Sequence, residues 1–179
     1  MFLMRLFVSL FEFLLAVVMS GCVIYVTYRI FIRANPDFNM EDEIKKGNIA
    51  TGLLVGTILI CASNFLQKGM SSVVSMFRLY ITAPAQCPLP FYQMVLLGTA
   101  HLAFSMFLAV LTISITLRLF GRLTSHMQEG RELQKGNVAV GILLSSVVIV
   151  ATLYVSEGVS SLSKALVPQP SIGRIQVLK

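Results

Sequence analysis

The sequence predicts an all-α integral membrane protein whose four transmembrane helices form two tandem, parallel two-helix repeats. Three observations lead to this fold class. The 179 residues are 56% hydrophobic and only 12% charged, with a mean hydropathy of +0.81, whereas charged residues make up about 25% of an ordinary soluble domain. The apolar residues are gathered into four long runs. Finally, a segment of the first half recurs in the second half at a fixed offset of 89 residues.

The four apolar runs cover residues 6–32, 49–66, 94–117 and 138–155. Each is close to or longer than the about 18 to 20 residues that cross the hydrocarbon of a bilayer as a helix. They show no alternation of polar and apolar residues, which favours helices over a β-barrel. We predict transmembrane helices at about 5–31, 47–68, 92–120 and 136–157. The predicted organisation is repeat 1 at 1–83, with an interfacial extension at 69–83, a proline-rich connector at 84–90, repeat 2 at 91–167 and a tail at 168–179.

The duplication is clearest where Glu43–Leu54 recurs without a gap as Glu132–Leu143. Across 31 aligned positions that start at Glu43 and Glu132, 12 residues are identical, and most others exchange one apolar residue for another. Repeats must be identified before a fold is assigned. Two copies of a two-helix unit have the same orientation, so we expect a pseudo-twofold axis along the membrane normal. The repeat motif consists of Glu43, Gly47 and Asn48 in the first copy and Glu132, Gly136 and Asn137 in the second.

Basic residues gather at the helix ends beside the two repeat loops. Eight of the fourteen lysines and arginines lie there, so the positive-inside rule places both loops in the cytoplasm and both termini outside. This topology explains the net charge of +6 without a nucleic-acid partner. Glu43 and Glu132 are interpreted as helix-start charges, which the helix dipole favours. The basic residues expected to anchor the helix ends are Arg29, Arg33, Arg118 and Arg122.

The first span has an alternative interpretation as a removed signal, because Met19–Cys22 resembles the cleavage box of a bacterial lipoprotein. The apolar run continues beyond Cys22, and the matching span of the second copy is retained. We therefore predict that the first span stays in the mature protein. Cys22 and Cys61 lie within spans as small apolar residues, and Cys87 lies in a loop.

Small residues follow one face of the second predicted helix in each repeat. Without a hydrophobic drive between helices in lipid, close approach over small residues and side-chain hydrogen bonds hold them together. We predict that this face is a packing seam. The two asparagines at one end of it favour structural hydrogen bonding, and a polar path lined by them is the alternative. The predicted seam comprises Asn48, Gly52, Gly56 and Ser63 in repeat 1 and Asn137, Gly141, Ser145 and Thr152 in repeat 2.

Four ionisable residues lie within or at the edge of the spans, where burial of a charge is costly. Glu12 and His101 occupy equivalent repeat positions, as do Lys68 and Glu157. All four are predicted to lie near the outer boundary of the membrane. The favoured interpretation is snorkelling side chains at the interface. The alternatives are a charged outer cluster that handles protons or a cation and contact with a partner subunit.

The sequence contains no recognised catalytic, cofactor or metal pattern. It has no GxSxG, Walker loop, HExxH or CxxC motif. Its two histidines, His101 and His126, are predicted on opposite sides of the membrane, which argues against a shared metal site. We therefore predict no cofactor, no metal and no enzymatic activity.

The pattern Glu-x-x-Lys-Gly-Asn-x-Ala-x-Gly occurs at Glu43–Gly52 and again at Glu132–Gly141. With the apolar run that follows, it resembles the YjfL/YshE-type family of small bacterial inner-membrane proteins, which is catalogued as a domain of unknown function. The resemblance covers about residues 12 to 167. It implies paired-helix repeats in a bacterial inner membrane, and an association with envelope-stress systems and a cytoplasmic scaffold or coat partner. Lys68 departs from the acidic residue of the second copy, Glu157.

These observations predict an oligomeric structural or interaction subunit of a membrane complex, whose partners are the bilayer, further copies or other subunits, and a cytoplasmic scaffold protein. A proton- or cation-conducting channel or small transporter is the alternative. A membrane enzyme ranks below both, because no pair of nucleophile and base is visible in the sequence.

Overall fold

The computed structural model of the chain describes residues 2–33, 39–82 and 90–166. Four helices in this part are long and apolar enough to cross a membrane, so the predicted fold class is confirmed. These long helices are α1 (Phe2–Thr27), α3 (Ile49–Thr82), α4 (Phe91–Leu123) and α6 (Val138–Leu166). The short elements are a π-helix at Tyr28–Arg33, α2 (Met40–Lys45), a 3-10 turn at Ser125–Met127 and α5 (Glu129–Gln134).

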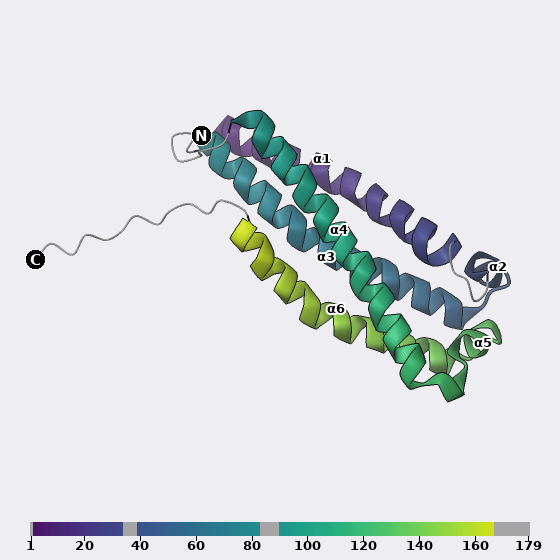
Figure 1. The fold of residues 1–179 in the computed structure, drawn as a ribbon. Coiled ribbons are helices and arrows are strands. Elements are labelled where there is room, and N and C mark those ends of the chain that lie inside the picture. The colour runs from purple at the N-terminus through teal and green to yellow at the C-terminus, as the bar shows by residue number, and fades with distance from the viewer. Residues whose placement is uncertain (1, 34–38, 83–89, 167–179) are drawn as a thin grey trace, which may run out of the picture.

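The two repeats run in the same direction. Figure 1 shows the four long helices side by side, with α2 and α5 together at one end of the bundle. Helix α1 leads towards this end and α3 leads away from it, and α4 and α6 repeat the same path. One unit is therefore α1, α2 and α3, and its copy is α4, α5 and α6.

Helix α3 is the centre of the molecule, since it packs against α1, α4 and α6. The main hydrophobic cluster is centred on α3, with Leu54 and Ile58, and includes Leu144 and Val148 of α6 as well as Ile113 of α4. Helix α1 is the least covered, with only 11% of its apolar window buried. Its exposed leucines and phenylalanines are suited to contact with lipid acyl chains.

Two predicted loops contain short helices that the sequence interpretation overlooked. Helix α2 occupies the end of the loop before α3, and α5 occupies the same place before α6. Asn39 caps α2, and its side chain accepts hydrogen bonds from the backbone of Glu41 and Asp42. Glu43 consequently lies in the first turn of α2, and not at the start of the transmembrane helix α3. Helix α3 also continues without interruption to Thr82, over the described part of the predicted interfacial extension, and its 34 residues give a length of about 50 Å.

The expected pseudo-twofold relation between the repeats is wrong. A twofold axis would bring the same face of α3 and α6 together. Instead, Ala50 of α3 lies against Gly141 of α6, although the repeat equivalent of Gly141 is Gly52. The two helices therefore meet through different faces. Cys87, most of the connector at 84–90 and the tail at 168–179 lie outside the described residues.

Candidate functional site

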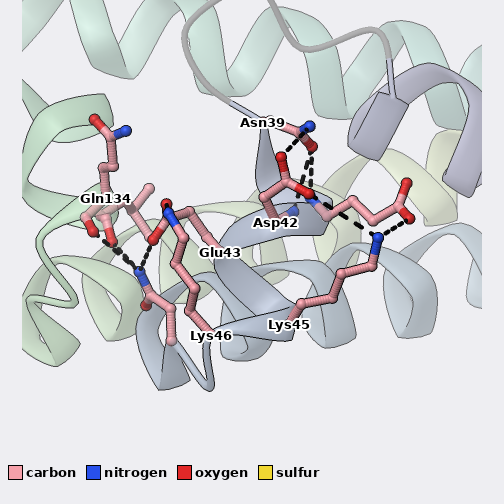
Figure 2. A network of polar contacts seen from close by, with 9 residues as sticks. Asn39, Asp42, Glu43, Lys45, Lys46 and Gln134 are labelled. Carbon is pink, nitrogen blue, oxygen red and sulfur yellow. Dashed lines mark hydrogen bonds and ion pairs between the residues drawn. The ribbon is translucent and has the colours of Figure 1, made fainter.

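The repeat motif forms a polar corner between α2 and α3, and Asn48 is its centre. The Asn48 amide donates to the backbone carbonyl oxygens of Leu133 at 2.7 Å and Gln134 at 3.3 Å. These two residues belong to the end of α5 in the other repeat. Figure 2 shows dashed bonds that reach the backbone beside Gln134, close to Glu43 and Lys46 of the first repeat, while the Gln134 side chain turns away. Asn48 thus joins repeat 1 to repeat 2, besides accepting a bond from Thr51 N at the start of α3.

Glu43 completes this corner. Its carboxylate accepts from Lys46 Nζ at 2.8 Å and from Asn48 Nδ2 at 3.3 Å, and the residue is only 6% exposed. The Lys46 ammonium, followed by the Asn48 amide, lowers the pKa of the Glu43 carboxyl below its ordinary value. The motif glutamate is therefore held ionised to support the lysine and asparagine that follow it.

The second copy of the motif forms an equivalent polar corner between α5 and α6. In the part of the chain that the structure describes, it lacks a hydrogen bond to the other repeat like the one that Asn48 makes, which we call the Asn48 bridge. The Glu132 carboxylate accepts from Asn137 Nδ2 at 3.0 Å and from Lys135 Nζ at 2.6 Å. The Asn137 amide, followed by the Lys135 ammonium, lowers the pKa of Glu132. Among the described residues, however, no hydrogen bond connects the Asn137 amide to the end of α2. The two motif asparagines therefore differ in their contacts, although their local sequences are alike.

Two glycines make the sharp turns at these corners. Gly47 and Gly136 both have φ of +81°, a left-handed conformation that is costly for residues with a Cβ. Each follows a short helix and places the asparagine at the start of the next long helix. The Lys-Gly-Asn part of the motif therefore has a structural reason at every position.

Only half of the predicted packing seam is buried. In α6, Gly141, Ser145 and Thr152 are buried against the rest of the bundle. In α3, Ser63 is exposed, and a Cβ placed on Gly52 or Gly56 would meet nothing within 4 Å. The Ser145 and Thr152 hydroxyls have no hydrogen-bond partner among the described residues. The buried half of the seam therefore works through small size rather than through side-chain hydrogen bonds.

The charged outer cluster is brought together only in part. Lys68 Nζ lies 3.0 Å from Glu157 Oε1, which forms an ion pair between α3 and α6. His101 is 5% exposed within α4, and its Nε2 has no hydrogen-bond partner among the described residues. Glu12 is half-buried on α1, and no ion pair joins it to His101 within the described chain. Lys68 and Glu157 are thus the one pair of the four that meets there.

The predicted basic anchors lie near the end of the bundle that carries α2 and α5. Arg29 is exposed on the π-helix, and Arg118 and Arg122 are exposed on the last turns of α4. Arg33 is the last residue of the π-helix. No group of three or more His, Cys, Asp or Glu suited to a metal ion is present in the described residues.

Sequence reasoning missed one acidic residue at this end. Glu129 opens α5, and burial raises the pKa of its carboxyl. Its Oε1 is buried without a hydrogen-bond partner in the described part of the chain. A glutamate at the start of a helix is ordinarily explained by the helix dipole, so nothing in the sequence indicated burial.

Four long apolar helices, which form two repeats of the same orientation with a short polar corner in each, define a multi-pass α-helical membrane protein. The comparison with known families gives a more particular result. A family model described as Domain of Unknown Function (DUF350) matches residues 5–159. The chain belongs to this family.

Neither of the other two comparisons identified a relative. No curated protein matches the chain, and no solved structure matches it.

Proposed function

We propose that the protein is a membrane-embedded interaction subunit, which assembles into an oligomer and presents its α2 and α5 end to a partner. The observation that carries this proposal is the bridge from Asn48 to the backbone of Leu133 and Gln134. It connects the two polar corners, so the charged side chains of both repeats are held in a fixed relation. A fixed charged surface is suited to recognition, because little conformational entropy is lost on binding.

The exposed arginines beside this end contribute positive charge to the proposed binding surface. Arg29, Arg118 and Arg122 are exposed, and each basic residue near an anionic membrane surface contributes about 1 kcal/mol of attraction. By the positive-inside rule, this end faces the cytoplasm. The resemblance described for the sequence motif favours a bacterial inner membrane, an envelope-stress system and a cytoplasmic scaffold protein as the partner.

Recruitment is tested by neutralising the basic anchors. In Arg29→Gln, Arg33→Gln, Arg118→Gln and Arg122→Gln combined, copurification of soluble partners and of anionic lipid from native membranes should fall. The matched control changes the same four residues to Lys, which keeps the charge. Partner and lipid are quantified separately by mass spectrometry. Equal recovery from the Gln variant and the unmodified protein would refute the proposed role of this surface.

Orientation is tested by labelling a single cysteine at the same end. In a variant with Cys22, Cys61 and Cys87 replaced by Ala, Gln128→Cys provides an exposed thiol in the corner before α5. A membrane-impermeant maleimide should label it only after the cells are opened. Labelling of intact cells to the same extent would reverse the proposed topology.

A proton- or cation-conducting role is the second candidate, and the buried His101 imidazole favours it. An ionisable group within a span is a functional hypothesis by default. Proton flux into liposomes should then decrease in His101→Gln and in the double variant Glu12→Gln with Glu157→Gln. Flux equal to that of the unmodified protein would count against conduction.

A further inference from the structure

The duplication allows each surface of one repeat to be compared with the same surface of the other. On α3, three residues that share hydrophobic clusters with α6 are buried: Leu54, Cys61 and Phe65 are 2%, 4% and 0% exposed. Their equivalents on α6 are Leu143, Val150 and Tyr154, which are 38%, 53% and 81% exposed. Ala50 is buried and its equivalent Ala139 is exposed. We call Ala139, Leu143, Val150 and Tyr154 the α6 open face.

For the residues that α6 contributes to this contact, the α6 copy is buried and the α3 copy is exposed. Residues Gly141, Ser145, Thr152 and Ser156 of α6 are buried. Their equivalents on α3 are Gly52, Gly56, Ser63 and Gln67, and each of these is exposed or half-exposed. We call these four residues the α3 open face. The single α3–α6 contact of the chain thus uses one face of each helix and leaves the partner face of each helix open.

The fit between α3 and α6 depends on a close approach that only glycine permits. A Cβ on Gly141 would lie 2.8 Å from the Ala50 oxygen and 2.9 Å from Ala50 Cα. On the open faces, Gly52 has the same freedom and Ala139 has the same small side chain. The two open faces therefore carry the same complementary shapes as the two faces already in contact.

The polar groups at the corner are matched in the same way. Asn48 donates to the carbonyls of Leu133 and Gln134. The equivalent acceptors for Asn137 are the carbonyls of Ile44 and Lys45 in repeat 1. Ile44 O accepts from Gly47 N, just as Leu133 O accepts from Gly136 N, and each carbonyl oxygen has a second lone pair. An Asn137 amide could thus make the same bridge to the α2 end of another copy.

The charges agree with this arrangement too. Within the chain, Lys68 of α3 pairs with Glu157 of α6 at the outer end of the contact. These are equivalent repeat positions, so a second contact of the same kind brings Glu157 of one copy towards Lys68 of the next. The charges remain opposite, whereas identical residues at this position would repel. The two repeats therefore carry opposite charges at this position. This difference argues against one shared chemical role for both residues, but it is what a repeated contact between the two positions requires.

We propose that a second copy of this chain docks head to tail, so that the α6 open face packs into the α3 open face of its neighbour. The inference rests on the proposed function of an oligomeric subunit and identifies the partner surface. Lipid is the other possible occupant, and exposed Leu or Val alone does not distinguish them, because acyl chains are equally apolar. The glycine fit, the Asn137 bridge and the charge pair are what favour a second copy. A contact between different faces generates a ring or an open row.

Cysteine cross-linking separates this geometry from others. Cys61 of α3 meets Thr152 of α6 inside the chain, and the equivalent positions on the open faces are Val150 and Ser63. With Cys22, Cys61 and Cys87 replaced by Ala, two differently tagged chains are coexpressed, one with Val150→Cys and one with Ser63→Cys. Mild oxidation in native membranes should produce a dimer that carries both tags. Chains with either substitution alone should remain uncrosslinked.

A control inside the chain shows that oxidation works at this depth. Thr152→Cys, with Cys61 retained and the other two cysteines replaced, should form an intrachain disulfide under the same conditions. If this control reacts and the mixed chains give no dimer, the open faces contact lipid and the inference is overturned. A dimer from Ser63→Cys chains alone would overturn it in favour of a symmetric contact.

Subunit counting on the same samples keeps the two proposals apart. Photobleaching of single fluorescent particles in native-lipid nanodiscs gives the number of copies without any cross-link. Several copies together with no cross-link would overturn only the head-to-tail contact. Single copies would overturn this contact and the oligomeric part of the proposed function together.

Discussion

At the scale of single residues, glycines at equivalent repeat positions differ in what surrounds them. Gly141→Ala should lower the free energy of unfolding by about 1–3 kcal/mol, the usual cost of overpacking, because the new Cβ would press on the Ala50 backbone. Gly52→Ala should cause no loss in the isolated chain, since its Cβ enters open space and alanine favours helix by about 1 kcal/mol. Both are measured by SDS titration of the monomer in detergent, followed by circular dichroism. Equal losses would contradict the asymmetric packing.

The two motif asparagines should differ in the same way. Asn48→Ala and Asn137→Ala both remove a side chain that caps a long helix, which costs about 1 kcal/mol. Asn48→Ala also removes the side-chain donor to the carbonyl groups of Leu133 and Gln134 in α5, of which Leu133 O keeps its bond from Gly136 N. We expect its unfolding free energy to fall by about 1–3 kcal/mol more than that of Asn137→Ala in the monomer. The two variants serve as matched controls for each other, and similar losses would show that the bridge contributes nothing.

The motif glutamates predict a loss of stability in acid. Glu43 and Glu132 have pKa values lowered from 4.5, so their contribution is complete above that pH and is lost as the pH falls below it. The thermal midpoint, followed by circular dichroism, should therefore decrease on acidification below about pH 4.5, and Glu43→Gln with Glu132→Gln should reduce this dependence.

Glu129 has the opposite effect on stability, because burial raises the pKa of its carboxyl. Glu129→Gln should raise the midpoint at neutral pH, as followed by circular dichroism.

At the scale of elements, the turns between short and long helices depend on backbone conformation more than on contacts. A Cβ on Gly47 would meet no atom within 4 Å, yet its φ is +81°. We expect Gly47→Ala to cost about 1–2 kcal/mol through backbone strain alone. Gly136→Ala should cost a similar amount, since its φ is also +81°. A negligible loss in thermal unfolding for either variant would show that the corner can adopt another turn.

The long helices were predictable from sequence because hydrocarbon imposes a minimum length of apolar residues and satisfies no backbone group. The short helices were not, since six residues such as Met40–Lys45 are too few to show a period. The seam composition was visible on both α3 and α6. The sequence did not show which of the two copies is buried. Neighbouring helices, rather than the helix itself, decide whether Ser63 or Thr152 is covered. The acceptors of Asn48 were equally hidden, since a backbone carbonyl has no signature in the sequence.

At the scale of the whole molecule, duplication gives α3 and α6 equivalent pairs of faces. The contact inside the chain uses one face of α3 and the other face of α6. A twofold relation would have paired equal faces and closed the structure. The observed pairing of Ala50 with Gly141 joins unlike faces, which leaves one unsatisfied face on each side. The same property that makes the repeats asymmetric therefore leaves the chain with two unlike faces of complementary shape, and the proposed head-to-tail contact would place the polar corners of every copy on the same side.

This arrangement predicts a substitution that separates folding from assembly. Gly52→Val should leave the monomer folded, because the side chain enters open space, but it should prevent close approach of the neighbouring Ala139. Gly21→Val on α1 is the matched control, since its Cβ also meets nothing within 4 Å and the equivalent position already carries a valine, Val110. Subunit counting in nanodiscs should give fewer copies for Gly52→Val and an unchanged number for Gly21→Val, with equal helical content by circular dichroism. If both variants assemble like the unmodified protein, the α3 open face does not receive a second copy.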